Sequence, residues 1–318
     1  MSESNKLVAQ EERAQAATKS IAPGLLLATC GAIAFSGKAI IVKLAYRYGV
    51  DAVTLIMYRM LFALPIFAVM AWWATYRQDG GGKAPLTRKD WLGVLWLGFT
   101  GYYLASFLDF AGLAYISASL ERLILYLNPT LVMLLGLVMY QRRVMAPQII
   151  GMAISYCGVV LVFGHEITLQ GDSQRAGAAW GALLVFLSAV SYAIYLVYSG
   201  EMVKRLGSLR LVGLATTVAC LCCLLQFVLL RPMSAAAVAP EVIWLSLLNA
   251  TLCTAVPVLM VMMAIERIGA SLAAQTGMVG PMSTILMGVL ILGEPFTAWV
   301  AAGTVLVIAG IFVFTRTR

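Results

Sequence analysis

Charged side chains are scarce in this chain of 318 residues. Asp, Glu, Lys and Arg make up only 11% of it, whereas 62% of the residues are hydrophobic. Soluble domains carry about 25% charged residues, so this chain has too little charge to cover a water-exposed surface. A disordered chain is excluded by the large apolar content. The class that remains is a polytopic α-helical membrane protein.

The chain also lacks the sequence patterns of several chemistries. It has no Walker lysine loop, no HExxH, no G-x-S-x-G and no pair of carboxylates on one helix face, so neither ATP hydrolysis nor catalysis is indicated. The only histidine, His165, is far in sequence from the Cys-x-Cys-Cys cluster at 220–223. Helix packing explains that cluster better than a metal site does. We therefore expect no enzyme activity, no cofactor and no metal.

Stretches without Asp, Glu, Lys or Arg indicate the membrane spans. Ten of them are at least 17 residues long, which is enough, or nearly enough, to cross the hydrocarbon core. They lack the alternation of a β-barrel, and backbone in lipid must satisfy its own hydrogen bonds, so helices are predicted. The ten segments are 20–37, 60–76, 91–108, 123–141, 144–165, 176–200, 211–230, 242–265, 268–293 and 295–315.

Lysine and arginine are distributed unevenly around these spans. With the N-terminus inside, 15 of them lie in inside segments, and only Arg47, Arg175 and Arg231 lie in outside loops. This bias predicts a multi-pass protein of the bacterial inner membrane with both termini cytoplasmic. The net charge of +8 is then an orientation signal, and the expected surroundings are the lipid bilayer and not nucleic acid.

The second half of the chain repeats the first at an offset of 152 residues. Pro129 falls on Pro281 and Gly158 on Gly310, and such residues set backbone geometry. Each half holds five predicted helices, and because five is odd the second half must be inverted in the membrane. The expected divisions are a cytoplasmic polar tail at 1–20, a first repeat at 21–164, a periplasmic connection at 165–176 and a second repeat at 177–318.

Inverted repeats are typical of secondary transporters, whose two similar halves exchange inward-open and outward-open states. Some channels and other membrane proteins have them too, and a non-transporting membrane scaffold is the alternative from a different class. A small-molecule site is expected between the halves, near the middle of the membrane.

Four segments resemble a known family: FSGKAIIVKLA, YRMLFALP, SASLERLILYLNPTLVMLLGLVMY and GASLAAQTGMVGPMSTILMGVLILGEPFTAWVAAGTVLVIAGI. They are similar to the EamA-type family of the drug/metabolite transporter superfamily, over about 22–315. The resemblance implies ten helices in two inverted five-helix repeats, and export of amino acids or other metabolites. Its Gly-Glu pair is Gly293-Glu294 here, whereas the first repeat departs from the pattern at Gln141-Arg142 and Glu121-Arg122.

Six charged side chains lie in or close to predicted spans, where a charge is energetically expensive. All belong to the first half and map to the outer third of the membrane, where they would form a vestibule that attracts carboxylates or phosphates. Asp109 is too short to reach the interface, so Arg59 or Arg122 is expected to pair with it, structurally or functionally. The six are Lys38, Lys43, Arg59, Asp109, Glu121 and Arg122.

Polar residues recur on single helix faces. Each such stripe alone is explained by helix–helix hydrogen bonding, whereas three together favour a polar cavity. The stripes are Tyr102, Ser106 and Asp109; Ser188, Ser191, Tyr192, Tyr195 and Ser199; and Ser271 and Gln275.

Helix-breaking residues occupy equivalent places in the fourth and ninth predicted helices. Asn128 and Pro129 lie in the first, and Gly277, Gly280 and Pro281 in the second. Broken helices at matched positions indicate a binding site or a gating hinge, and a kink for packing is the alternative.

Together these features predict a secondary transporter, an exporter of a small metabolite such as an amino acid, that works by alternating access as a monomer or homodimer. An uncoupled facilitator is the alternative within transport. If protons drive the cycle, Asp109 or Glu121 must carry them, because the second half has no acidic residue deep in a span. The residues assigned to the translocation path are Lys38, Arg59, Tyr102, Ser106, Asp109, Glu121, Arg122, Asn128, Tyr192, Tyr195 and Gln275.

Overall fold

The computed structural model describes residues 3–76, 86–140, 145–169, 172–276 and 279–315, and within these ranges the chain is helical and has no strand. Eight of its helical stretches are long and apolar enough to span a membrane. Two shorter apolar helices follow, Val279–Leu292 and Ala298–Val313. The predicted all-helical membrane class is therefore confirmed, with eight of the ten predicted spans reaching full length among the described residues.

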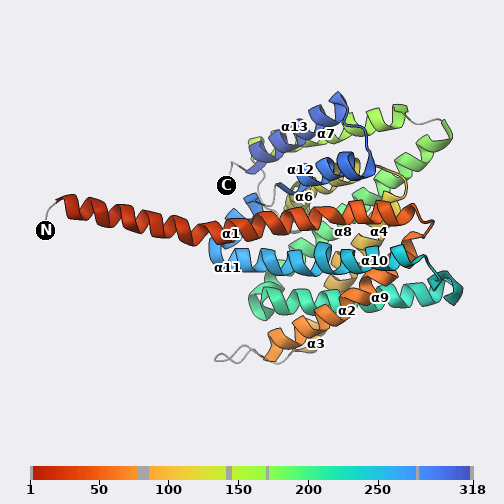
Figure 1. Cartoon of the computed structure of the whole chain (residues 1–318), viewed down its shortest axis with the longest axis horizontal. Coiled ribbons are helices and arrows are strands. Elements are labelled where there is room, and N and C mark those ends of the chain that lie inside the picture. Colours follow the sequence, from red (N-terminus) through yellow and green to blue (C-terminus); the bar gives the residue numbers. More distant parts are fainter. Residues whose placement is uncertain (1–2, 77–85, 141–144, 170–171, 277–278, 316–318) are drawn as a thin grey trace.

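The helices form one bundle, and the N-terminal part of α1 projects from it (Figure 1). The predicted polar tail is thus helical from Glu3 onward. The elements are α1 Glu3–Tyr46, α2 Ala52–Tyr76, α3 Arg88–Leu97, η1 Gly98–Leu104, α4 Ala105–Leu113, α5 Ala118–Leu125, α6 Asn128–Tyr140, α7 Ala146–Leu169, α8 Asp172–Leu206, α9 Ser208–Leu230, η2 Met233–Ala236, α10 Pro240–Ala250, η3 Thr251–Ala255, α11 Val256–Thr276, α12 Val279–Met287, η4 Gly288–Leu292 and α13 Ala298–Thr315.

Helix pairing follows the internal repeat. The most extensive contacts join α7 with α13, α2 with α9, α1 with α11 and α4 with α8. Two π-helical segments, η1 and η3, also lie about 152 residues apart and interrupt equivalent spans. A π-helical turn inside an α-helix often marks a functional site, so the same device recurs in each half.

Glycines let α7 and α13 approach closely. A Cβ built on Gly303 would lie 2.7 Å from the carbonyl oxygen of Gly158, and one on Gly310 would lie 2.5 Å from that of Gly151. At the offset of 152 residues, Gly303 corresponds to Gly151 and Gly310 to Gly158. The two contacts are therefore the same contact with the halves exchanged, as expected for a two-fold relation between repeats.

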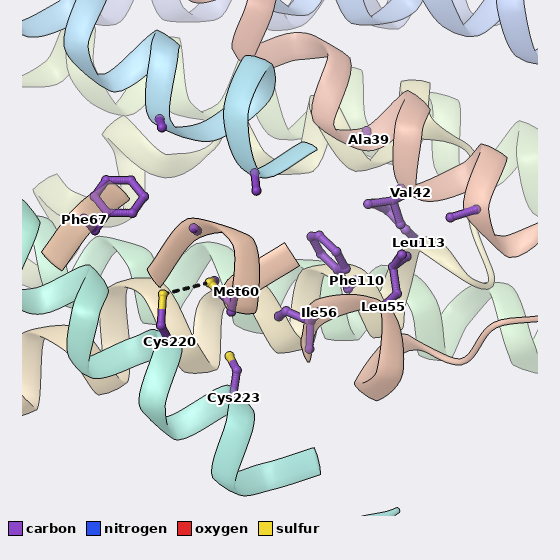
Figure 2. Packing of buried hydrophobic residues seen from close by; sticks show 14 of the residues in the cluster. Ala39, Val42, Leu55, Ile56, Met60, Phe67, Phe110, Leu113, Cys220 and Cys223 are labelled. Carbon is purple, nitrogen blue, oxygen red and sulfur yellow. Dashed lines mark hydrogen bonds between the residues drawn. The ribbon is translucent and has the colours of Figure 1, made fainter. Parts of the chain in front are cut away.

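The largest apolar cluster lies where α1, α2, α4 and α9 meet (Figure 2). Phe67, Phe110 and Met60 are almost fully buried there. The Sγ of Cys220 lies 3.7 Å from the Sδ of Met60, and Cys223 is buried beside it. The cysteines at 220 and 223 therefore contribute to apolar packing, as the sequence predicted.

The predicted boundary between the eighth and ninth spans is wrong. Glu266 and Arg267 were expected to lie in a loop, but α11 continues past them to Thr276. Residues 268–276 therefore belong to the same helix as residues 256–267. The helix can continue because charged residues prevent burial in lipid, but they do not break backbone hydrogen bonding. The next apolar helix among the described residues is Val279–Leu292.

Candidate functional site

Five charged side chains from four helices meet inside the bundle. Lys38 comes from α1, Arg59 from α2, Asp109 from α4, and Glu121 and Arg122 from α5, and each is at most 7% exposed. The Nζ of Lys38 lies 2.5 Å from the Oδ2 of Asp109 and 3.8 Å from the Oε1 of Glu121. The Nε of Arg122 lies 4.0 Å from the Oε2 of Glu121. We call these five residues the charge cluster.

The partner of Asp109 differs from the expected one. The ion pair is with Lys38, and neither Arg59 nor Arg122 forms an ion pair with Asp109 among the described residues. Sequence could place these residues at similar depth, but helix rotation determines which of them face each other. Lys38 and Asp109 are both buried, so breaking their pair would leave an uncompensated charge and cost about 3–5 kcal/mol.

Hydroxyl groups from the second half hold the two arginines. Arg59 donates through Nε and Nη2 to the Oγ1 of Thr254 in η3, at 3.3 and 3.2 Å. Arg122 donates through Nε to the Oγ1 of Thr284 in α12, at 2.9 Å. The guanidinium carbon Cζ of Arg59 also lies over the ring of Phe110, 5.1 Å from the ring centroid. The charge cluster thus joins the two halves of the chain.

Several polar atoms of the charge cluster have no hydrogen-bond partner among the described residues. They are the Nη1 of Arg59, the Nη2 of Arg122, the Oδ1 of Asp109 and both carboxylate oxygens of Glu121. Buried polar groups are normally paired, so such atoms call for a ligand, a proton or water. The two arginine N–H groups match the oxygens of a carboxylate or phosphate.

The tyrosines predicted for the path form a separate group. Tyr102 of η1 and Tyr195 of α8 have their hydroxyl oxygens 3.3 Å apart, and the ring of Tyr192 stacks on that of Tyr195. Gly101 makes room for this contact, because a Cβ there would collide with the ring of Tyr195. Ser106 is half-buried on α4, one turn before Asp109.

The serine stripe on α8 is explained by helix packing. Ser188 donates to the carbonyl oxygen of Ala105 at 2.7 Å, and Ser191 donates to that of Thr100 at 2.8 Å. Both hydroxyls are therefore used between helices, and for these two residues the prediction of a polar cavity is wrong. Their bonds fix α8 against η1 and α4.

The predicted helix breaks lie at helix ends. In the first half α5 ends at Leu125 and α6 begins at Asn128, whose buried Oδ1 has no partner among the described residues. Pro129 is the second residue of α6, where the missing N–H has no helical partner to lose. In the second half α11 ends at Thr276 and α12 begins at Val279. The chain of the first half is therefore non-helical just before Asn128 and Pro129, and residues 277–278, where the second break was predicted, lie outside the described residues.

The start of α12 contacts α1. The carbonyl oxygen of Gly280 accepts a hydrogen bond from the Oγ of Ser36, at 2.6 Å. Pro281 is buried as the third residue of α12. Gly277 lies outside the described residues, and so do the side-chain surroundings of Gln275.

Two carboxylates bind the N-terminus of α5. Glu294 accepts from the backbone N of Ala118 at 2.7 Å, and from the N and Oγ of Ser119 at 3.2 and 2.7 Å. Glu166 accepts from the backbone N and the Oγ of the N-cap residue Ser117, both at 2.8 Å. Carboxylates suit this place because a helix N-terminus presents free N–H groups and positive potential.

An open pocket of about 470 Å³ lies beside these carboxylates. Lys43 and Arg47 line it together with Glu166 and Glu294. The guanidinium of Arg47 also donates to the carbonyl oxygen of Leu292, at 2.9 Å. Lys43, one of the six charged residues predicted in or close to the spans, thus lines a charged pocket.

Comparison with known proteins matches this architecture to one family. The EamA-like transporter family matches residues 22–164 and again residues 179–316. The chain belongs to the EamA-like transporter family. Similar relatives include the uncharacterized transporter YcbK of Bacillus subtilis, 30% identical over 88% of both chains. An uncharacterized transporter of Archaeoglobus fulgidus is 23% identical over 91% of this chain and 96% of its own.

A solved crystal structure shares the fold of this EamA-like chain. It aligns with a TM-score of 0.62 and 17% identity, over 92% of this chain and 96% of its own. Family and relatives together show that the protein is a membrane transporter, the coarser part of the predicted function.

Sequence reasoning missed the residues through which the second half of this EamA-like chain contacts the charge cluster. Thr254 and Thr284 are hydroxyl residues in apolar helices, where the usual bond is to the carbonyl of the preceding turn. Glu294 had a signal, because it stands in the Gly-Glu pair that carries the family resemblance. Its role as a contact between the halves required the structure.

Proposed function

We propose that the protein is a secondary transporter that exports a small metabolite such as an amino acid, and that it works by alternating access. The charge cluster carries this proposal. Its five side chains come from the first half, and its arginines bind hydroxyls of the second half. Charges inside a membrane are expensive and mark substrate or ion pathways, and transporter sites lie between repeats.

The chemistry of the charge cluster favours an anionic group on the substrate. It holds three cationic side chains and two carboxylates, and two arginine nitrogens remain without a partner among the described residues. A substrate carboxylate between Arg59 and Arg122 would satisfy both nitrogens with charge-assisted hydrogen bonds. An amino acid meets this requirement, and its ammonium group would face the carboxylates of Asp109 and Glu121.

The proposed mechanism needs two halves of similar structure and opposite orientation. The exchanged glycine contacts between α7 and α13 and the matched π-helical segments support it. The hydrogen bonds of Glu294 to α5 would close the bundle at one end, and their release would open it. The distribution of lysine and arginine predicts that this end faces the periplasm.

The orientation is tested by cysteine labelling. Tyr48 and Lys89 are both exposed and stand on connections predicted to lie outside and inside. In a background without native cysteines, an impermeant maleimide added to intact cells should label Tyr48→Cys and spare Lys89→Cys. The reverse pattern would invert the proposed topology of the inner-membrane protein.

Transport itself is tested in proteoliposomes. Purified protein would be assayed for efflux of a panel of radiolabelled amino acids, which should reveal saturable flux of at least one of them. Arg122→Gln should abolish that flux, because it removes a cation and the unpaired Nη2 from the charge cluster. The matched control Asp51→Asn changes an ion pair at the start of α2 and should leave flux intact. Equal flux in both variants would contradict the proposed site.

A further inference from the structure

The two carboxyl groups of the charge cluster have different surroundings. Asp109 has an ammonium 2.5 Å from one oxygen. Glu121 is 0% exposed, no N–H group or hydroxyl of the described residues donates to either of its oxygens, and its carboxyl lies within hydrogen-bond reach of that of Asp109. An ionised carboxylate without donors is among the most costly groups to bury, and a protonated one is not. The geometry therefore distinguishes Glu121 from Asp109, whereas the sequence alone gave no reason to prefer either as the proton carrier.

Three charged groups face Glu121. They are Lys38 from α1, Asp109 from α4 and Arg122 from its own helix α5. The two cations favour its ionised form, whereas Asp109 and the loss of solvent favour its neutral form. From α12, the group near Arg122 is the hydroxyl of Thr284, which does not titrate. Small movements of these neighbours would change which form is favoured.

The two cations nearest to Glu121 make their shorter contacts with other groups. Lys38 is closer to Asp109 than to Glu121, at 2.5 against 3.8 Å. The Nε of Arg122, 4.0 Å from Glu121, donates instead to Thr284 in the second half. This is the arrangement expected when Glu121 carries a proton. If Glu121 loses the proton, the ammonium can move between the two carboxylates and Arg122 can leave Thr284.

We propose that Glu121 is the proton-binding residue of the transport cycle, and that Asp109 serves as the resting partner of Lys38. This inference rests on the proposed function and names its coupling ion. In one state the carboxylate of Glu121 takes a proton from water on the periplasmic side, forming one O–H bond. In the other state that bond breaks and the proton passes to water on the cytoplasmic side. Because Arg122 links Glu121 to Thr284, the protonation state controls a bond between the halves.

Infrared spectroscopy tests the proposal without any substrate. Protein in lipid nanodiscs would be stepped in pH, and the C=O stretching band of a buried protonated carboxyl would be recorded. Wild type should show this band near neutral pH, and Glu121→Gln should abolish it. Asp109→Asn should keep the band, at a pH displaced from wild type because Asp109 no longer shares Lys38. The control Asp51→Asn, at an exposed ion pair, should leave the band unchanged.

A band that survives in Glu121→Gln, or one that is missing from wild type at every pH, would overturn the assignment. If Glu121→Gln fails to fold, Glu121→Asp provides the second test. It keeps a carboxyl group, so the band should move but should not disappear. In proteoliposomes, Glu121→Asp should keep accumulation driven by a pH gradient, and Glu121→Gln should lose it. Gradient-driven accumulation in this variant would refute the coupling role alone, whereas absence of any flux in wild type would refute the proposed function.

Discussion

The contact of Glu294 with α5 provides the sharpest test of how the halves move. Glu294 belongs to the second half and accepts three hydrogen bonds from Ala118 and Ser119 of the first half. Each bond to a charged group contributes about 1.5–3 kcal/mol when fully formed. Water replaces part of this in Glu294→Gln, because the site is half-exposed. We therefore expect the closed state to lose about 2 kcal/mol, or roughly thirtyfold in its equilibrium with the open state.

Double electron–electron resonance between two spin labels measures this shift in the equilibrium between closed and open states. Labels at Ala114 and Phe296, exposed residues of opposite halves, should report one short distance in wild type. In Glu294→Gln a longer distance should appear, because a thirtyfold change raises an open population of about 1% to about a quarter. Glu166→Gln is the matched control, since Glu166 binds the same helix end from within the first half. Unchanged distances in Glu294→Gln, or equal opening in both variants, would refute the reasoning.

Two further predictions concern stability. Gly303→Ala should lower the free energy of unfolding by about 1–3 kcal/mol, because its Cβ meets the carbonyl of Gly158. The control Gly164→Ala has open space around its Cβ and should leave the free energy of unfolding unchanged. Equal shifts of the melting temperature in both variants would contradict this packing. Burial tends to raise the pKa of Asp51, but hydrogen bonds from Thr54 and Arg231 outweigh it and hold that pKa below its usual value. The stability from this pair is therefore present above the ordinary carboxyl pKa and is lost as the pH falls through the lowered one. Arg231→Gln should destabilise the protein by about 1 kcal/mol or less near neutral pH and have no effect in strong acid; a pH-independent difference in denaturation would exclude the ion pair as its cause.

The sequence predicted the helices, and the position of each charge along its helix, because both depend on local quantities. A stretch without charge long enough to cross lipid identifies a span, and the position of Lys38 or Asp109 along its span gives its depth. The break before Pro129 was predictable for the same reason, since proline acts on its own backbone.

The arrangement within the charge cluster was not predictable because it depends on how the helices are rotated. The rotations of α1 and α2 decide whether Lys38 or Arg59 reaches Asp109, and nothing local in the sequence fixes those rotations. The hydrogen bonds of Thr254 and Thr284 to the arginines could not be predicted for the same reason. The predicted boundary at Arg267 was wrong for another reason. A charge ends the uncharged stretch of sequence but does not end the helix that contains it.

Counterflow in proteoliposomes tests alternating access most directly. Vesicles loaded with an unlabelled solute identified by the flux panel would be diluted into a trace of the labelled solute. A single site that faces one side at a time exchanges inner for outer solute, so labelled solute should rise transiently above its equilibrium level. Unloaded vesicles should show no such overshoot. If labelled solute instead equilibrates at the same rate with and without loading, the protein is a channel and the proposed mechanism is wrong.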